Sequence, residues 1–398
     1  MADNKPDMKC RLLEMPLYLC LAGLLAAGSL PDATLVRAQN APQNGGAAAD
    51  YQARLTQYQA ARSAYETEAS AYWDSVAAKR RLRNAKRRDH LPIELDDYVL
   101  TQPPVYSGPP RPIDPRAPAP PPPERPEIPV VADFLKNAAQ QFGFVPDRPV
   151  TEIDFKRAYV RAAVGAGLTR EQIVGVYAFE TGGNGAYDSQ AGLVPYRPGA
   201  RAISPAVGYN QLLSTNTISL LAEDGNRYLA ALRQKAKSRT GPAKLAMERK
   251  IEALKRMIAY SRSVPNRWSE RDRLAKTTLG GFGIHAAVLD IDLGPMLQVQ
   301  KLTDSVLFAR AKGYTAPLTA AELELMNLTG DGNGFDMVTM PQALRARVPT
   351  ANFFQREGYE RNPVARRTGV VANLIGDIEG KMNHGAQAQG ARDMTAAF

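Results

Sequence analysis

The chain has almost no cysteine and very little histidine. Among its 398 residues there are two cysteines and three histidines. Cys10 and Cys20 both lie in the first forty residues, so the chain beyond them offers no thiol for disulfides or thiolate chemistry. His90, His285 and His384 are too scattered for a zinc site or a Ser-His-Asp triad. We therefore predict no metal site and no cofactor.

Alternation of apolar and polar residues at every second position, the pattern of a half-buried strand, is also rare. Beyond Val131 the pattern is instead helical, and Thr151 and Thr169 each open a segment that resembles a capping box. Further helical stretches are expected at about 217–237, 242–261, 284–312, 318–328 and 362–378. These patterns predict an all-α fold.

The charge is unbalanced toward lysine and arginine. The formal net charge is +10 and the sequence pI is about 9.5. This balance suits a polyanionic partner such as nucleic acid, anionic lipid or an acidic wall polymer, and it does not choose among them.

The first forty residues have the layout of a secretory signal. A charged segment precedes an apolar run from Leu12 to Leu30, and Val36 and Ala38 offer suitable residues before a cleavage point. We predict a signal peptide over residues 1–38 and hence a periplasmic or secreted, wall-associated protein. Glu14 interrupts the apolar run, and the alternative is a retained membrane anchor.

A long helix is expected from Tyr51 to about Ala78, a stretch without proline or glycine. Tyr51, Tyr58, Tyr65 and Tyr72 recur every seven residues and form one stripe along it. This stripe indicates packing on a neighbouring helix. The alternative is self-association through a short coiled coil.

A basic run at residues 79–88 follows, with seven lysines and arginines in ten positions. Such a run is usually a solvated face. In an exported protein it could instead contact lipid headgroups or an anionic wall polymer, whereas a signal peptide argues against nucleic acid.

Thirteen prolines occupy the 27 positions from Pro103 to Pro129, which predicts a polyproline II spacer of roughly 80 Å. The predicted organisation is a signal peptide (1–38), an N-terminal helix with its basic run (39–100), a Pro-rich linker (101–130), one helical domain (131–384) and a flexible tail (385–398).

The helix that begins at Thr169 carries one carboxylate on its apolar face. Ile173, Val176 and Tyr177 define that face, and Glu180 continues it. Gly182 and the residues after it then end the helix. Partial burial without a nearby cation raises a carboxyl pKa, as a general acid at neutral pH requires. The alternative is a structural ion pair.

A second segment, Ile203 to Leu213, follows about twenty residues of polar loop. Together with Glu180-Thr181 it resembles the lysozyme-like lytic transglycosylases of the soluble lytic transglycosylase family, whose pattern is Glu-Ser at a helix end and a later Gly-Leu-Met-Gln. Here Thr replaces Ser, and Tyr-Asn replaces Leu-Met. The family's third signature, Ala-Tyr-Asn-Ala-Gly, is absent as such, and Asn327 in Leu325 to Gly330 is the nearest match.

The resemblance implies a lysozyme-like fold and cleavage of the bond between N-acetylmuramic acid and N-acetylglucosamine in peptidoglycan. It implies that Glu180 is the catalytic acid and then the base, giving a 1,6-anhydro product. Residues implied to bind the glycan are Thr181, Ser204, Gly208, Tyr209, Asn210, Gln211 and Asn327.

Two alternatives remain open from the sequence. A second catalytic carboxylate, with Asp188, Asp290 and Asp292 as candidates, would indicate a hydrolytic muramidase. A non-catalytic peptidoglycan-binding envelope scaffold is the other. The segment Asp331 to Asp336 has calcium-like spacing but lacks the glutamate at position twelve, and it is expected to be a tight turn.

Overall fold

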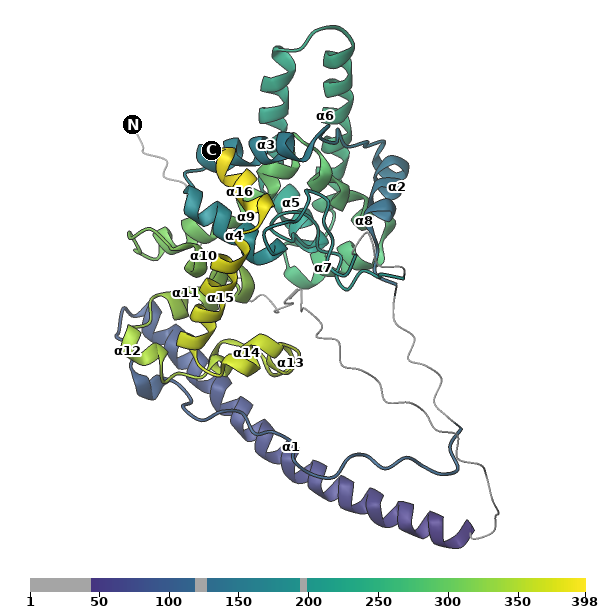
Figure 1. Ribbon diagram of the computed structural model, residues 1–398, viewed down its shortest axis with the longest axis vertical. Helices are drawn as coiled ribbons and strands as arrows, with labels where there is room; N and C mark the ends of the chain where they lie inside the picture. The colour runs from purple at the N-terminus through teal and green to yellow at the C-terminus, as the bar shows by residue number, and fades with distance from the viewer. Residues whose placement is uncertain (1–43, 119–126, 194–198) are drawn as a thin grey trace. The chain divides into compact units, whose positions relative to one another are not determined.

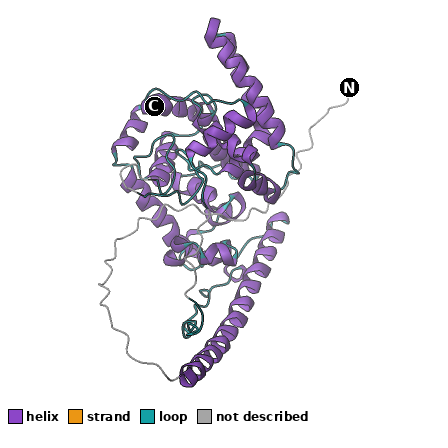
Figure 2. Cartoon of the chain, turned by 90° about the vertical axis from the view of Figure 1, so that its right-hand side faces the viewer, coloured by secondary structure: helices purple, strands orange, loops and turns teal. Residues whose placement is uncertain are grey.

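The computed structural model describes residues 44–118, 127–193 and 199–398. In these ranges every regular element is a helix and no strand is formed, so the all-α prediction is confirmed (Figures 1 and 2). None of the helices in these ranges combines the length and the apolar character that crossing a bilayer requires. The predicted signal peptide, with Cys10 and Cys20, and the run Pro120 to Pro123 lie outside the described residues.

The chain divides into two compact units. The larger unit contains Ile128–Met340 and Ala372–Phe398, and the smaller unit joins the described part of Gly23–Glu127 to Pro341–Val371. The structure thus differs from the expected single domain over 131–384, because residues 341–371 pack with the N-terminal helix.

The helices of the larger unit are α2 (Val131–Phe142), α3 (Glu152–Gly165), α4 (Arg170–Thr181), α5 (Ser214–Lys237), α6 (Gly241–Ser261), α7 (Trp268–Thr277), α8 (Leu279–His285), η2 (Ala286–Leu289), α9 (Gly294–Ala311), α10 (Ala320–Thr329), α11 (Asp331–Val338), α15 (Val371–Gly385) and α16 (Gln389–Ala396). Local sequence explains several starts. Thr151, Thr169 and Thr319 begin α3, α4 and α10, each within a capping box.

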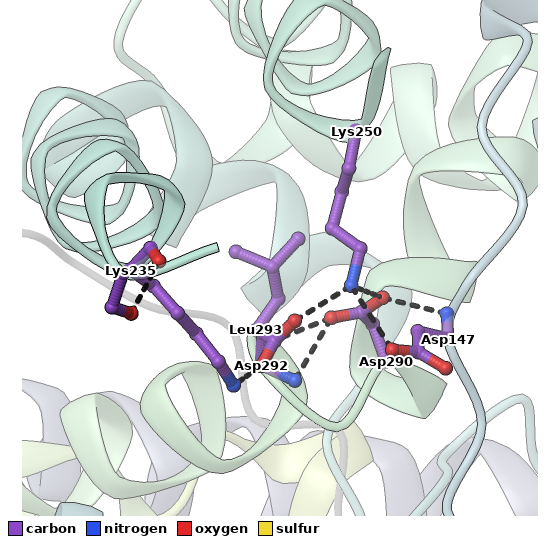
Figure 3. Close-up of polar contacts among 7 residues, drawn as sticks. Asp147, Lys235, Lys250, Asp290, Asp292 and Leu293 are labelled. Atoms are coloured by element: carbon purple, nitrogen blue, oxygen red, sulfur yellow. Dashed lines mark hydrogen bonds and ion pairs between the residues drawn. The ribbon is translucent and has the colours of Figure 1, made fainter. Parts of the chain in front are cut away.

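The helix expected over 284–312 is interrupted between η2 and α9. Asp290 ends η2, and its Oδ1 accepts from the backbone amides of Asp292 and Leu293 at 2.9 and 3.1 Å. Such a side chain offers the backbone an alternative to continued helix. Lys250 of α6 donates to Asp292 at 2.7 Å and lies 2.8 Å from Asp290, which is fully buried (Figure 3). This ion cluster fastens the α5–α6 hairpin, seen projecting at the top of Figure 1, to the start of α9.

The C-terminal residues differ from the expected flexible tail. Residues 389–396 form α16, and Ala391 and Met394 are buried. Lys156 of α3 donates to the carbonyl of Gly390 at 2.9 Å. Burial of these small and apolar side chains against α3 and α4 explains the order. The segment is mostly polar, so its few buried apolar positions did not indicate a helix from the sequence.

The helices of the smaller unit are α1 (Asn44–Arg88), η1 (Leu95–Asp97), α12 (Gln342–Arg345), η3 (Thr350–Phe353), α13 (Arg356–Glu360) and α14 (Pro363–Thr368). The tyrosine stripe of α1 meets the Pro-rich segment of the same chain. Tyr106 lies edge-on to Tyr65 with ring centroids 5.5 Å apart, and to Tyr58 at 6.3 Å. Tyr72 donates to the carbonyl of Thr101 at 3.0 Å. An extended segment, and not a second helix, therefore packs on part of the stripe.

The basic run continues α1 and is partly interior, in contrast to the expected solvated face. Arg83 is fully buried, and it donates to the carbonyls of Asp97 and Asn352 at 3.0 and 3.2 Å. Arg80 also donates to the Asn352 carbonyl, and Lys86 pairs with Asp97 at 2.6 Å. These cations satisfy carbonyls and a carboxylate inside the smaller unit. Contact of the run with an anionic surface stays a prediction.

Candidate functional site

Glu180 lies on the last turn of α4, on the face that the sequence assigned to it. Ile173, Val176 and Tyr177 on that face are fully buried, while Glu180 keeps part of its surface exposed. The helix ends at Gly182, whose φ of 63° is left-handed. Glu180 is thus anchored by a buried helix and still reachable from solvent.

The loop after Glu180 is held by the C-terminal helices. Gly183 has a φ of 77°, and a Cβ on it would lie 1.9 Å from the carbonyl oxygen of Gly385 at the end of α15. Only glycine permits this approach. The Asn184 side chain accepts from the backbone amide of Gly390 at 3.0 Å. The C-terminal segment thereby fixes the position of the backbone beside Glu180.

A second carboxyl group faces Glu180 from α10. Glu324 has no exposed surface. Asn327, one turn later, donates from Nδ2 to Oε1 of Glu180 at 3.3 Å and to Oε1 of Glu324 at 3.4 Å. The two carboxyl groups are also within hydrogen-bonding reach of each other. We call Glu180, Glu324 and Asn327 the carboxyl pair with its bridging amide.

Burial sets the protonation of this pair. It raises the pKa of Glu180 to about 8, an effect that hydrogen bonding from Glu324 partly opposes. Burial also raises the pKa of Glu324 well above its ordinary value, and the neighbouring Glu180 adds to the rise. No cation in the described part of the chain forms an ion pair with Glu180. The structural ion pair considered from the sequence is therefore not present there.

The segment around Gly208 forms a fixed turn. Gly208 has a φ of 89°, and a Cβ would lie 2.8 Å from Oε1 of Gln298. Gln211 is also left-handed at φ 41°, and its Nε2 donates to the carbonyls of Ser189 and Gly208 at 3.1 and 2.8 Å. The turn thus depends on hydrogen bonds that this glutamine makes to its own loop.

Tyr209 and Asn210 within that turn are turned into the core. Tyr209 has no exposed surface, and its hydroxyl donates to Glu152. Asn210 is 3% exposed and accepts at Oδ1 from the Tyr159 hydroxyl at 2.7 Å. Tyr159 lies near the carboxyl pair, since the charges of Glu324 and Glu180 add to the burial that raises its pKa. This arrangement gives Tyr209 and Asn210 a supporting position, and their contact with a glycan stays a prediction.

The remaining predicted binding residues are also engaged within the protein. The Thr181 hydroxyl donates to the carbonyl of Tyr177 at 2.6 Å, one turn back in α4. Ser204 is buried and accepts from the backbone amide of Ala206 at 3.1 Å. Asn327 is the one member of the predicted set for which the structure gives a hydrogen bond to Glu180. The structure therefore brings Glu180 and Asn327 together, whereas the hydroxyls of Thr181 and Ser204 bond to nearby backbone groups.

The three aspartates considered as a second carboxylate all meet cations. Asp188 pairs with Arg148 at 2.6 Å. Asp290 and Asp292 share Lys250, and Lys235 also donates to Asp292 (Figure 3). Charged partners of this kind suit structural roles.

Sequence reasoning missed Glu324, the carboxyl that does face Glu180. A signal was present. Glu324 is the one charged residue in the run from Leu323 to Leu328, where an acid has no solvated face to occupy. The helical spacing of apolar residues that identifies Glu180 as inward-facing would also have identified Glu324.

The other features noted in the sequence have structural placements. Asp331 to Asp336 lies within α11 and is not the expected tight turn. His285 is buried, with Nδ1 2.9 Å from the Thr217 hydroxyl and Nε2 3.0 Å from the Pro205 carbonyl. Across residues 44–118, 127–193 and 199–398, no cluster of three or more His, Cys, Asp or Glu side chains could hold a metal ion.

Comparison of the chain with protein-family models, curated proteins and solved structures gave no match.

Proposed function

We propose that the larger unit is a lysozyme-like peptidoglycan lytic transglycosylase with Glu180 as its catalytic acid. The main support for the proposal is the exposure of Glu180 together with its raised pKa. This carboxyl group is reachable from solvent, it has no cationic partner in the described chain, and burial raises its pKa to about 8. A carboxyl that remains protonated at neutral pH can serve as a general acid.

The proposed reaction uses the carboxyl group of Glu180 twice, first as an acid and then as a base. Glu180 donates it to the oxygen that links N-acetylmuramic acid to N-acetylglucosamine, and the bond from that oxygen to C1 breaks. The resulting Glu180 carboxylate then accepts the proton of the muramic acid 6-hydroxyl as that oxygen bonds to C1. The product is a 1,6-anhydro sugar, Glu180 is protonated again, and no water is consumed.

The position of Glu324 favours this course over two-carboxylate hydrolysis. Hydrolytic glycosidases place their two carboxyl groups on opposite sides of the scissile bond, about 5 Å or more apart. Glu324 is fully buried and shares Asn327 with Glu180. A sugar ring therefore has no access between the two groups, and Glu324 is not placed to act as nucleophile or as base toward water.

The test is digestion of purified peptidoglycan by the full chain and by Glu180→Gln. The matched control is Glu379→Gln, which changes an exposed glutamate on α15 in the same unit. We expect soluble glycan fragments from the wild type and the control, and none from Glu180→Gln. Equal activity of Glu180→Gln would contradict the assignment of the acid.

The same experiment addresses the envelope scaffold. Sedimentation of the chain with insoluble peptidoglycan reports binding separately from cleavage. Binding by both wild type and Glu180→Gln without any fragments would replace the enzyme proposal by the scaffold.

A further inference from the structure

We propose that Glu324 is a positioning residue that stays a neutral carboxylic acid and donates a hydrogen bond to Glu180 throughout the reaction. This inference rests on the proposed function of Glu180. It is carried by the placement of the buried carboxyl pair between α4 and α10.

The two helices are held in register at one end. Gln172 in the first turn of α4 donates to the carbonyl of Leu318, just before α10 begins, at 2.8 Å. Thr319 then starts α10 by accepting from the backbone amide of Glu322 at 3.2 Å. Glu324 is fully buried, as are Leu325 and Met326 beside it. The close packing around them leaves the Glu324 side chain no room to turn toward solvent. Glu324 is therefore fixed against the last turn of α4.

The oxygen atoms of Glu324 show where its proton belongs. Oε1 accepts from Asn327, whereas Oε2 is buried and no donor among the described residues is placed to bond it. A buried carboxylate oxygen without a donor would be costly, but a protonated oxygen can itself donate. Glu180 is the acceptor within reach, and its Oε1 already accepts from Asn327. A proton on Glu324 therefore lets Oε2 donate a hydrogen bond to Glu180, which an ionised Glu324 cannot do.

The charges around the pair agree with a neutral Glu324. On α9, Lys301 stabilises the ionised form of Glu324, but this effect is smaller than burial and the repulsion from Glu180, so the pKa remains well above its usual range. On α3, Tyr159 is a buried phenol that donates elsewhere. On α11, Asp331 accepts from Ser305 at 2.6 Å, and Asp336 is buried. Lys301 is the one cation among these groups, and its effect is too small to offset the repulsion between two adjacent carboxylates.

The role of Glu324 begins when Glu180 gives up its proton. The new Glu180 carboxylate then has two donors, the Asn327 amide and the Glu324 carboxylic acid, and charge-assisted hydrogen bonds are the stronger kind. When Glu180 accepts the proton of the 6-hydroxyl, Glu324 is unchanged. It transfers no proton to the substrate, and its effect is to stabilise and orient the carboxylate form of Glu180.

The test compares Glu324→Gln with Glu324→Leu on soluble glycan strands. The glutamine amide keeps a donor and the shape, so we expect kcat within about threefold of the wild type. Leucine removes the donor, and we expect kcat to fall by about tenfold to a hundredfold with KM nearly unchanged. The limb of the pH profile that reports ionisation of Glu180 should move to higher pH in Glu324→Leu. Circular dichroism establishes that both variants are folded.

Two kinetic outcomes overturn the inference. If Glu324→Gln is as inactive as Glu180→Gln, then Glu324 gives up its own proton and is not a positioning residue. If Glu324→Leu keeps full activity and an unshifted pH profile, then the hydrogen bond has no role.

An infrared measurement separates this inference from the proposed function. At pH 7 both wild type and Glu324→Gln should show the carbonyl band of protonated Glu180. Isotope-edited difference spectra between them should show one further band of a protonated carboxylic acid, that of Glu324, which only the wild type has. If this Glu324 band is present in a protein that cleaves no glycan, the proposed function fails and the neutral Glu324 stands. If the band is absent, the inference fails even when glycan is cleaved.

Discussion

Replacing Glu180 by glutamine should stabilise the larger unit at alkaline pH. Burial raises the pKa of this carboxyl from 4.5 to about 8, so the folded state holds a proton that the unfolded state releases above pH 4.5. A state that binds more protons loses stability as pH rises, and the loss is complete once pH exceeds the folded pKa. Glutamine has the same shape and no proton to lose, so Glu180→Gln removes this part of the pH dependence.

The size of the effect follows from the pKa change. At about 1.4 kcal/mol for each pKa unit, ionising Glu180 in the folded protein costs about 3 to 5 kcal/mol between pH 4.5 and pH 9. Stability differences between Glu180→Gln and wild type should therefore be small near pH 5. At pH 9 the variant should be more stable by about that amount.

Urea unfolding followed by the fluorescence of Trp268 in a Trp73→Phe background measures the larger unit alone, because Trp268 lies in α7 and Trp73 in α1. Glu379→Gln, at an exposed position on α15, is the matched control. A Glu180→Gln variant whose advantage over wild type is the same at pH 5 and pH 9 would refute the reasoning.

Three further predictions concern the support of the site. Lys250→Met leaves Asp290 and Asp292 without the buried cation they share and should cost about 3 to 5 kcal/mol by urea unfolding; a loss below 1 kcal/mol, on the order of a surface pair, would contradict a buried role. Burial lowers the pKa of His285 from 6.5 to about 4, so stability should fall by about 3 kcal/mol as pH drops through this window. His285→Gln should lose that slope, and an unchanged slope would assign it to other groups. Gly208→Ala combines a left-handed φ with a Cβ 2.8 Å from Gln298 and should lower stability by about 1 to 3 kcal/mol; an unchanged melting temperature would show that the turn relaxes.

Local signals in the sequence predicted much of the fold. The capping boxes at Thr151 and Thr169 and the helical phase of Glu180 depend on residues within two turns of each other. The inward position of Glu180 could therefore be obtained from α4 alone. Its hydrogen bond with Asn327 joins two residues that the sequence had singled out separately.

Other parts depended on contacts distant in sequence, which local patterns do not record. The basic run looked solvated because nothing near it reveals the carbonyl of Asn352, which Arg80 and Arg83 approach from more than 260 positions away. The C-terminal tail looked flexible because its partners, α3 and the loop after α4, lie near residues 156 and 184. Similarly, helical phase can mark Glu324 as inward-facing, but its pairing with Glu180 becomes visible only when α10 is placed beside α4.

The most direct test of the central claim is the mass of the glycan product formed in water enriched in ¹⁸O. A mechanism with Glu180 as the only carboxyl that exchanges a proton with the substrate predicts 1,6-anhydro ends that are lighter than hydrolysed ends by one water and carry no ¹⁸O. The same ends should be absent with Glu180→Gln. Reducing ends that contain ¹⁸O, formed by the wild type, would contradict the account and show that water attacks the sugar.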